Sequence, residues 1–207
     1  HCFDKSKINK KLIFMKKECD EDFHTLLDSK IKLEGKNGVF LLDNEIISIA
    51  GVMGGKSTSC SSNTKKVLVE CAYFEPELII GKSTKYNLSS DSAHKFERGV
   101  DPSIQEKTLK RFVKIVEEHS NIKNLKMISF GNLGPKKTLT KDFNKINKVL
   151  GTELSNDLMK ESLEKIGFEI GRKIQIPYHR HDINSHNDLA EEVARVIGYD
   201  NLPNNKI

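Results

Sequence analysis

The sequence lacks the features that mark several common classes of protein. No apolar run in its 207 residues approaches the length of a membrane span, and no signal-peptide pattern opens the chain. Its four cysteines, Cys2, Cys19, Cys60 and Cys71, form no Cys-x-x-Cys pair, which argues against a zinc site and against a disulfide framework. We therefore expect reduced thiols in a cytoplasmic protein that has no membrane partner.

Internal repeats, low-complexity tracts and an initiator methionine are also missing. The chain begins at His1, so we expect a fragment of a longer protein, with room for one large domain or two small ones. The net charge of +5 is unevenly placed: residues 103–150 hold eleven Lys/Arg against four Asp/Glu. Such a stretch can face RNA phosphates or form an ordinary solvated surface.

The first part of the chain predicts a β-sheet core. Residues 39–42 and 46–50 favour strands, and Asp43 and Asn44 between them tolerate the positive φ of a hairpin turn. Residues 67–71 predict a third, buried strand. Asp101 and Pro102 predict a helix start, with a cap followed by proline at the first helical position. The expected core face of that helix comprises Ile104, Leu109, Phe112, Val113 and Val116.

A boundary is expected at residues 131–135, where two glycines and a proline separate two patterns. The domains would then be 1–135 and 136–207. In the second, helical patterns at 142–150 and 155–166 precede short strands at 168–170 and 173–177 and a last helix. The expected fold class is α+β: a mixed α/β domain with a β-sheet core, followed by a small winged-helix-like domain.

The last helix groups four carboxylates around its start. Its apolar face comprises Leu189, Val193, Val196 and Ile197. We expect Asn187 to cap the helix and Gly198 to end it, with Pro203 just beyond that end. The carboxylates are Asp182, Asp188, Glu191 and Glu192, the last three spaced to share the opposite face. Oxygen ligands of this kind suit Mg²⁺, although acidic residues in a first turn also simply complement the helix dipole.

The acidity of this helix bears on nucleic-acid binding. Winged helices often bind DNA through an exposed basic helix, whereas an acidic face repels phosphate unless a cation intervenes. We therefore expect no DNA partner. A DNA-binding regulator would have to show salt-dependent duplex binding.

Residues 180–203 carry a resemblance to a known family. This segment contains Arg-x-Asp, an Asp six residues later, Leu-x-Glu-Glu-Val-x-Arg and Gly-Tyr-x-x-Leu-Pro. Together these motifs resemble the end of the metal-binding, winged-helix-like domain in the β subunit of bacterial phenylalanyl-tRNA synthetases. In that family, the carboxylates that match Asp182, Asp188, Glu191 and Glu192 ligate Mg²⁺. The resemblance thus implies Mg²⁺ as a cofactor.

The first part of the chain resembles the editing domain of the same family. IAGVMGG at residues 49–55 matches Ala-Gly-(Ile/Val)-Met-Gly-Gly, and ECAYF at 70–74 matches Glu-(Ser/Cys)-Ala-x-Phe. SDSAHKFERGVDP at 90–102 and HCFD at 1–4 match two further signatures. The resemblance implies a tRNA-editing domain over residues 1–135 that hydrolyses tyrosine wrongly attached to tRNA(Phe).

Glu70 and His1 would act on the substrate itself. A site that binds the tyrosine hydroxyl discriminates against phenylalanine, which would leave the polar group of the site unpaired. Glu70 is the residue expected to accept the phenol hydrogen bond. His1 is expected to position the terminal adenosine or the attacking water.

Glycines and serines would complete the editing pocket. Gly51, Gly54 and Gly55 permit close approach of the backbone and can present N–H groups to an ester oxygen. Ser90 and Ser92 match residues that line the pocket, although the order Ser92-Ala93 departs from the family's commoner Ala-Ser. Such a glycine turn is also often structural, and the serines could simply cap a helix.

The resemblance also implies partners. They are an α subunit in a cytoplasmic (αβ)₂ heterotetramer, and tRNA(Phe), which the α subunit charges using ATP. We identify no class II ATP-binding motif in the chain, so ATP and phenylalanine would bind to the full enzyme. The alternative is a catalytically inert module that contacts RNA or another subunit.

Overall fold

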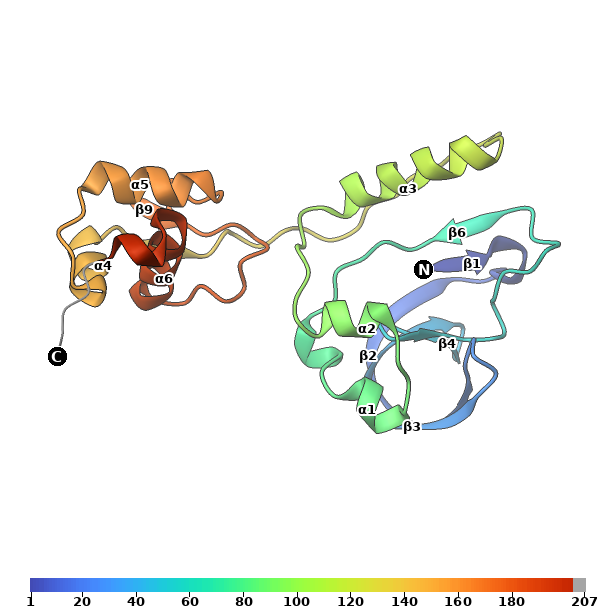
Figure 1. The fold of residues 1–207 in the computed structure, drawn as a ribbon. Coiled ribbons are helices and arrows are strands. Elements are labelled where there is room, and N and C mark those ends of the chain that lie inside the picture. Colours follow the sequence, from blue (N-terminus) through green and yellow to red (C-terminus); the bar gives the residue numbers. More distant parts are fainter. Residues whose placement is uncertain (203–207) are drawn as a thin grey trace. The chain divides into compact units, whose positions relative to one another are not determined.

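The structure is a computed structural model that describes residues 1–202 and divides into two compact units, His1–Lys126 and Met127–Ile207 (Figure 1). Both units combine helices with antiparallel strands, which confirms the expected α+β class. Within the described residues, none of the helices has both the length and the apolar character needed to cross a membrane.

Two antiparallel sheets build the first unit. One has the order β2-β3-β4-β5 and the other pairs β1 with β6. The hairpin predicted around Asp43 is confirmed: this residue has φ 54 in the turn between β3 and β4. The strands are β1 (Cys2–Asp4), β2 (Leu12–His24), β3 (Lys30–Leu42), β4 (Glu45–Ile49), β5 (Met53–Gly54) and β6 (Val67–Val69).

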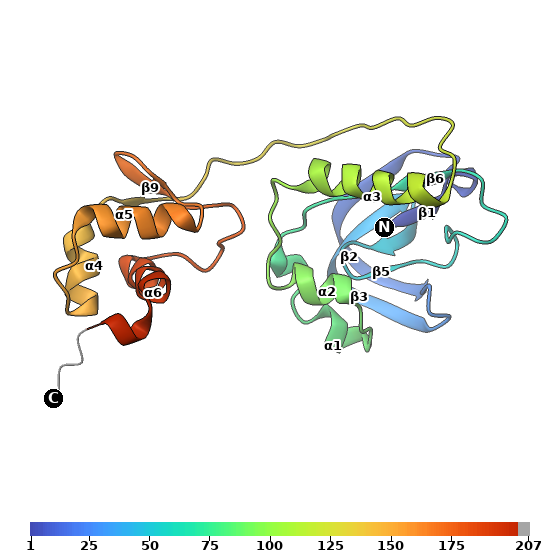
Figure 2. The same ribbon diagram turned by 45° about the horizontal axis from the view of Figure 1, so that its top comes forward.

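Short helices and one longer helix accompany these sheets. They are η1 (Lys5–Lys7), η2 (Pro76–Leu78), α1 (Lys82–Tyr86), α2 (Asp91–Phe96) and α3 (Gln105–His119). The views from two directions place α3 along the ribbon formed by β1 and β6 (Figure 2). The core of the unit includes Phe3, Leu33, Val39, Ile47 and Ile79, each almost completely buried. Burial of such side chains contributes roughly 1.5–3 kcal/mol each.

Three expectations for this unit were wrong in detail. The strand expected at 67–71 ends at Val69 and is not buried, since Val67 is 53% exposed in a two-stranded ribbon. The helix expected at Asp101 starts later, at Gln105, because the Asp101 carboxylate accepts hydrogen bonds from Ser103 and forms a turn. None of the residues in α3 is buried, so its apolar face is not the core face that we expected.

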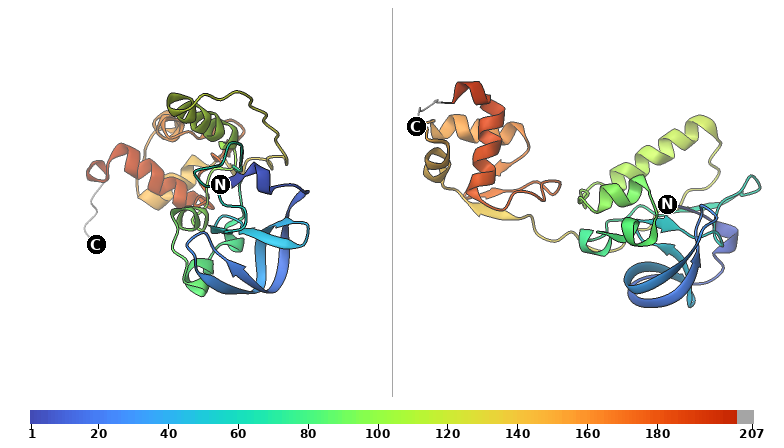
Figure 3. Two further views of the ribbon diagram at one scale, coloured as in Figure 1. Left: turned by 90° about the vertical axis from the view of Figure 1, so that its right-hand side faces the viewer. Right: turned by 60° about the horizontal axis from the view of Figure 1, so that its bottom comes forward.

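The second unit has the order expected for a winged-helix-like domain. The helices predicted at 142–150 and 155–166 are confirmed, and Asp142 and Ser155 are their N-caps. The sheet of this unit has the order β7-β9-β8. Figure 3 shows the ribbon of the unit, in orange and red, from two further directions. The elements are β7 (Thr138–Thr140), α4 (Phe143–Leu150), α5 (Asn156–Lys165), β8 (Glu169–Ile170), β9 (Lys173–Gln175), α6 (His186–Ile197) and η3 (Tyr199–Asn201). The core includes Ile146, Met159, Leu163, Ile174 and Leu189.

The cap of α6 corrects the sequence expectation. Ser185, rather than Asn187, is the N-cap, because its hydroxyl accepts hydrogen bonds from the backbone of Asn187 and Asp188. The Asp188 side chain returns to the backbone of Ser185 and completes a capping box. Gly198 ends the helix as expected. Pro203 lies outside the described residues.

Candidate functional site

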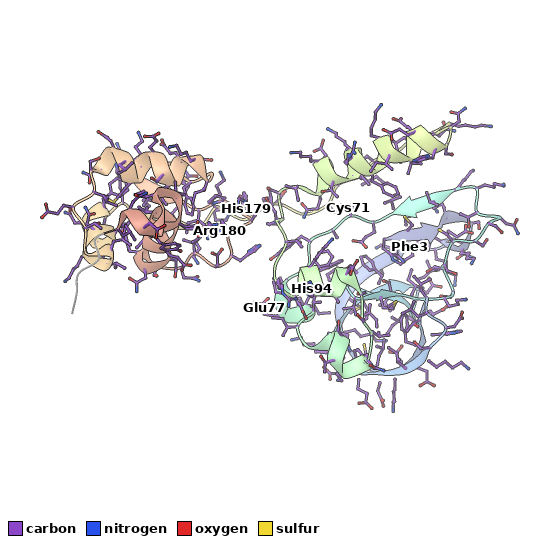
Figure 4. The ribbon with its side chains drawn as sticks, in the orientation of Figure 1. Phe3, Cys71, Glu77, His94, His179 and Arg180 are labelled. Carbon is purple, nitrogen blue, oxygen red and sulfur yellow. The ribbon has the colours of Figure 1, made fainter. Side chains whose placement is uncertain are left out.

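The ribbon of β1 and β6 brings His1 and Glu70 together. Cys2 pairs with Val69, so the two residues just outside the strands face each other. The Glu70 N–H donates to the His1 carbonyl at 2.7 Å, and the His1 nitrogen donates to the Glu70 carbonyl at 2.6 Å. This end of the ribbon lies between the labelled Phe3 and Cys71 (Figure 4).

The Glu70 carboxyl group is mostly enclosed by protein. Its side chain is 18% exposed, and burial raises the pKa of Glu70 above its ordinary value. The terminal ammonium of His1, 3.7 Å from Oε2, and the backbone N–H of Ala72 act in the opposite direction on this pKa. A carboxyl group of this kind accepts a hydrogen bond from a hydroxyl when ionised and donates one when protonated.

Gly54 lies directly against the His1 ring. A Cβ atom at this position would lie 2.5 Å from His1 Nε2, so a larger residue would push the His1 ring from its place. The ring of His1 also packs edge-on against Phe3, with 4.5 Å between the ring centroids. The structure therefore joins the predicted residues His1, Glu70 and Gly54 in one place.

The start of the glycine turn is constrained by its backbone and by its surroundings. Gly51 has φ +70, and a Cβ atom there would lie 2.9 Å from Ile79 and 3.1 Å from Phe74. Both the left-handed conformation and the contact with apolar side chains favour glycine.

Gly55 does not present its N–H group to a ligand, although we expected it to. Its N–H donates to the carbonyl of Ile47 at 2.8 Å, so this group is engaged within the sheet and does not point to a ligand. A Cβ atom would lie 2.7 Å from the same carbonyl oxygen. Gly55 thus permits close approach of two backbones.

Ser90 and Ser92 fasten the turn to the start of α2. Ser90 Oγ donates to the carbonyl of Val52 at 2.7 Å and accepts from the Ala93 N–H as the N-cap. Ser92 Oγ donates to the carbonyl of Gly51 at 2.9 Å. The structure therefore brings both serines to the predicted turn, as supports for its carbonyl groups. The sequence signal for this role is the pair of hydroxyls at a helix start.

A shallow hollow of about 280 Å³ lies beside α2, with Ser90, His94 and Glu97 in its lining. Of the predicted site residues, Ser90 borders it. A larger hollow belongs to the second unit, around Asn147 and residues 151–154, and contains none of the predicted site residues. His1, Glu70 and Gly54 border neither of these hollows, and hydrogen bonds and close packing hold them together.

The acidic cluster of the second unit forms a network with arginines. Arg180, labelled in Figure 4, donates to Asp182 through Nε at 2.9 Å and Nη2 at 2.5 Å, and to Glu192 through Nη2 at 2.7 Å. Arg195 donates to the other oxygen of Glu192. These hydrogen bonds hold the pKa of Glu192 and of Asp182 below their ordinary values.

The remaining two carboxylates, those of Asp188 and Glu191, have different surroundings. Asp188 Oδ2 accepts from the backbone N–H groups of Asn184 at 2.7 Å and Ser185 at 2.8 Å, and these bonds lower the pKa of Asp188. Glu191 is exposed, whereas Glu192 is 5% exposed. The spacing of Asp188, Glu191 and Glu192 along α6 therefore does not give them equal exposure, because Glu192 is buried against Arg180.

The contacts of the four carboxylates show how well they fit Mg²⁺. Carboxylate oxygens are the donors that Mg²⁺ prefers, and Asp182 and Glu192 already converge on one cationic nitrogen, that of Arg180. Over residues 1–202, however, no group of three or more His, Cys, Asp or Glu side chains is placed to hold a metal ion. The donor chemistry fits the ion, and a guanidinium occupies the point of convergence.

Comparison with protein families finds two adjacent matches. Residues 1–121 match the B3/4 domain and residues 139–199 match the tRNA synthetase B5 domain. The first match contains the site around Glu70, and the second contains the carboxylates at 182–192.

Individual relatives agree with these matches. The chain is 32% identical to a phenylalanine–tRNA ligase β subunit of Francisella tularensis, over 98% of this chain and 27% of the relative. It is 33% identical to that of Vibrio cholerae, over 99% of this chain and again 27% of the relative. The chain thus spans about a quarter of the length of these curated relatives.

A solved structure is also similar. It is an N-terminal fragment of the phenylalanyl-tRNA synthetase β subunit from Pyrococcus horikoshii, with a TM-score of 0.47 and 19% identity. The alignment covers 96% of this chain and 59% of that one.

Proposed function

The chain belongs to the phenylalanine–tRNA ligase β-subunit family, spanning its B3/4 and B5 domains, and we propose that its first unit hydrolyses tyrosine mistakenly attached to tRNA(Phe). The observation that carries the proposal is the largely buried Glu70 carboxyl beside His1 and Gly54. Three segments distant in sequence contribute to this one place.

Glu70 would select the substrate by its hydroxyl group. A tyrosine side chain could donate its phenol hydrogen to the carboxylate, whereas phenylalanine would desolvate the carboxylate further without offering it a hydrogen bond. Leaving a buried polar group unpaired costs about 1–3 kcal/mol, or more when the group is charged. This difference supplies the discrimination that an apolar pocket alone lacks, since such a pocket rejects an added hydroxyl only ~10²-fold.

The other residues would orient the ester. The His1 ring, packed between Gly54 and Phe3, would position the terminal adenosine or the attacking water. Gly51 and Gly54 would allow the substrate close to the backbone, while Ser90 and Ser92 hold the turn in shape. Fixed positioning of ester and water removes part of the entropic barrier to hydrolysis.

The proposed setting is the whole ligase. We propose a cytoplasmic (αβ)₂ enzyme in which the α subunit charges tRNA(Phe) and the full enzyme binds ATP and phenylalanine. In the second unit, Asp182, Asp188, Glu191 and Glu192 would hold Mg²⁺, which supplies positive charge that fastens the segment before α6 to the helix. The alternative remains an inert module that contacts RNA or another subunit.

Deacylation of charged tRNA tests the proposal. The purified chain should release tyrosine from Tyr-tRNA(Phe) faster than phenylalanine from Phe-tRNA(Phe), and Glu70→Ala should remove this preference. Glu45→Ala is the matched control, because Glu45 is an exposed glutamate at the start of β4. Release at the buffer rate by the wild-type chain, with its fold verified by circular dichroism, would favour the inert module.

A further inference from the structure

Arg180 joins two carboxylates that come from different segments. Asp182 belongs to the chain before α6 and Glu192 to the middle of that helix, and a single nitrogen, Nη2, contacts both. The contact with Asp182 is bidentate, a geometry that suits a planar guanidinium better than an ammonium group.

The guanidinium is enclosed rather than placed on the surface. The side chain of Arg180 is 15% exposed and that of Glu192 is 7% exposed. The guanidinium also lies 5.9 Å from the centroid of the Phe168 ring. The Arg180–Glu192 pair is therefore screened less by water and salt than the surface pairs of α5, whereas the Asp182 side chain is 61% exposed.

The charges within this group are balanced. Asp182 and Glu192 carry two negative charges, and Arg180 and Arg195 supply two positive ones. A divalent cation at the same place would bring Arg180 and the ion close together, and like charges that share a site repel strongly. It would also compete for the carboxylate oxygens that already accept from Arg180.

We propose that Arg180 is the resident cation of this cluster, and that Mg²⁺ and the Arg180 guanidinium exclude each other from Asp182 and Glu192. Mg²⁺ then binds to the fraction of molecules in which Arg180 has turned away, and its apparent affinity falls in proportion to that fraction. The inference builds on the proposed Mg²⁺ ligands and is independent of the proposed tRNA hydrolysis.

Calorimetric titration with MgCl₂ of wild type, Arg180→Gln and Arg195→Gln tests the exclusion. Arg180→Gln should bind Mg²⁺ about tenfold or more tightly than wild type, the gain expected if Arg180 turns away in about a tenth of the molecules. Arg195→Gln should change the affinity less, because the exposed Arg195 side chain contacts Glu192 and not Asp182. Adding Glu192→Gln to Arg180→Gln should remove the gain. The proposal would be overturned if Arg180→Gln bound Mg²⁺ as tightly as wild type or more weakly. It would also be overturned if neither wild type nor Arg180→Gln bound Mg²⁺.

A second measurement uses the unaltered chain, in case Arg180→Gln does not fold. The Arg180 Nε–Hε signal in a ¹⁵N-resolved NMR spectrum reports its bond to Asp182. During titration with MgCl₂ this signal should move toward the position of a free arginine, while that of the exposed Arg172 stays in place. Saturation with Mg²⁺ without a change in the Arg180 signal would show that both cations bind together and would contradict exclusion.

Discussion

The hydroxyl of Ser92 donates a 2.9 Å hydrogen bond to the carbonyl oxygen of Gly51, across 41 positions of sequence. With the neighbouring bond from Ser90 to Val52, it ties the glycine turn to the first turn of α2. Two consecutive carbonyl groups of the turn are thereby held by one short helix. The geometry of the candidate site therefore depends on residues that need not touch a substrate.

Ser90→Ala should lower the free energy of unfolding by about 1–2 kcal/mol, because the hydroxyl serves both as the N-cap of α2 and as a donor to Val52. Urea unfolding measures the loss. Ser89→Ala is the control, since Ser89 is exposed and precedes the cap. If the two variants lose equal stability, the N-cap and the tie to Val52 have no measurable role.

Gly51→Ala should destabilise the first unit more than Gly81→Ala. Both glycines have positive φ, +70 and +76, so alanine strains the backbone equally, by about 1–2 kcal/mol. At Gly51 the new methyl group also meets Ile79 and Phe74, whereas at Gly81 nothing lies within 4 Å. Overpacking of this kind typically adds about 1–3 kcal/mol.

Thermal unfolding of the two glycine variants side by side separates strain from overpacking. The difference between their melting temperatures reports the added contacts at Gly51. Equal melting temperatures would mean that Ile79 and Phe74 move aside without cost, and that the turn is less tightly packed than its distances indicate.

Glu70 should make the stability of the first unit depend on pH. Burial raises its folded-state pKa, so folding favours the protonated carboxyl. Its stabilising contribution is fully present below the unfolded pKa and is lost as pH rises through the folded pKa. Glu70→Gln, which keeps the shape without the charge, should therefore gain stability over wild type as pH increases from 4 to 7.

Urea unfolding at a series of pH values measures this gain, with Glu45→Gln as the exposed control. The Glu45 variant should follow the wild-type curve. A parallel curve for Glu70→Gln would show that Glu70 has the same pKa in the folded and unfolded chain, and would remove the electrostatic basis of the proposed selectivity.

Patterns local in sequence predicted much of the fold. The hairpin around Asp43 and the helices capped by Asp142 and Ser155 all depend on neighbouring residues, and the structure confirms them. Strand β2 escaped prediction because its residues alternate poorly between apolar and polar, and its long pairing with β3 creates it. Periodicity also cannot tell whether a helix such as α3 finds a partner for its apolar face.

The candidate sites were likewise predicted where they depend on local motifs and missed where they depend on contacts distant in sequence. The motifs named the residues that meet at the glycine turn, but the bond from Gly55 to Ile47 follows from strand pairing, which the motifs do not encode. In the second unit, spacing alone placed Glu192 beside Glu191 on one face. Spacing does not show that Glu192 is buried against Arg180 while Glu191 is exposed, because that contact depends on the loop before α6.

Ser185→Ala should lower the free energy of unfolding of the second unit by about 1 kcal/mol, while Asn187→Ala should change it little. The Ser185 hydroxyl accepts from the first turn of α6, and the Asp188 carboxylate bonds back to the Ser185 backbone, so the box satisfies N–H groups that the helix itself leaves free. Asn187 is exposed and lies inside the helix. Urea unfolding followed at the signals of α6 compares the two variants. A larger loss for Asn187→Ala would restore the cap that the sequence pattern predicted and would refute the capping box.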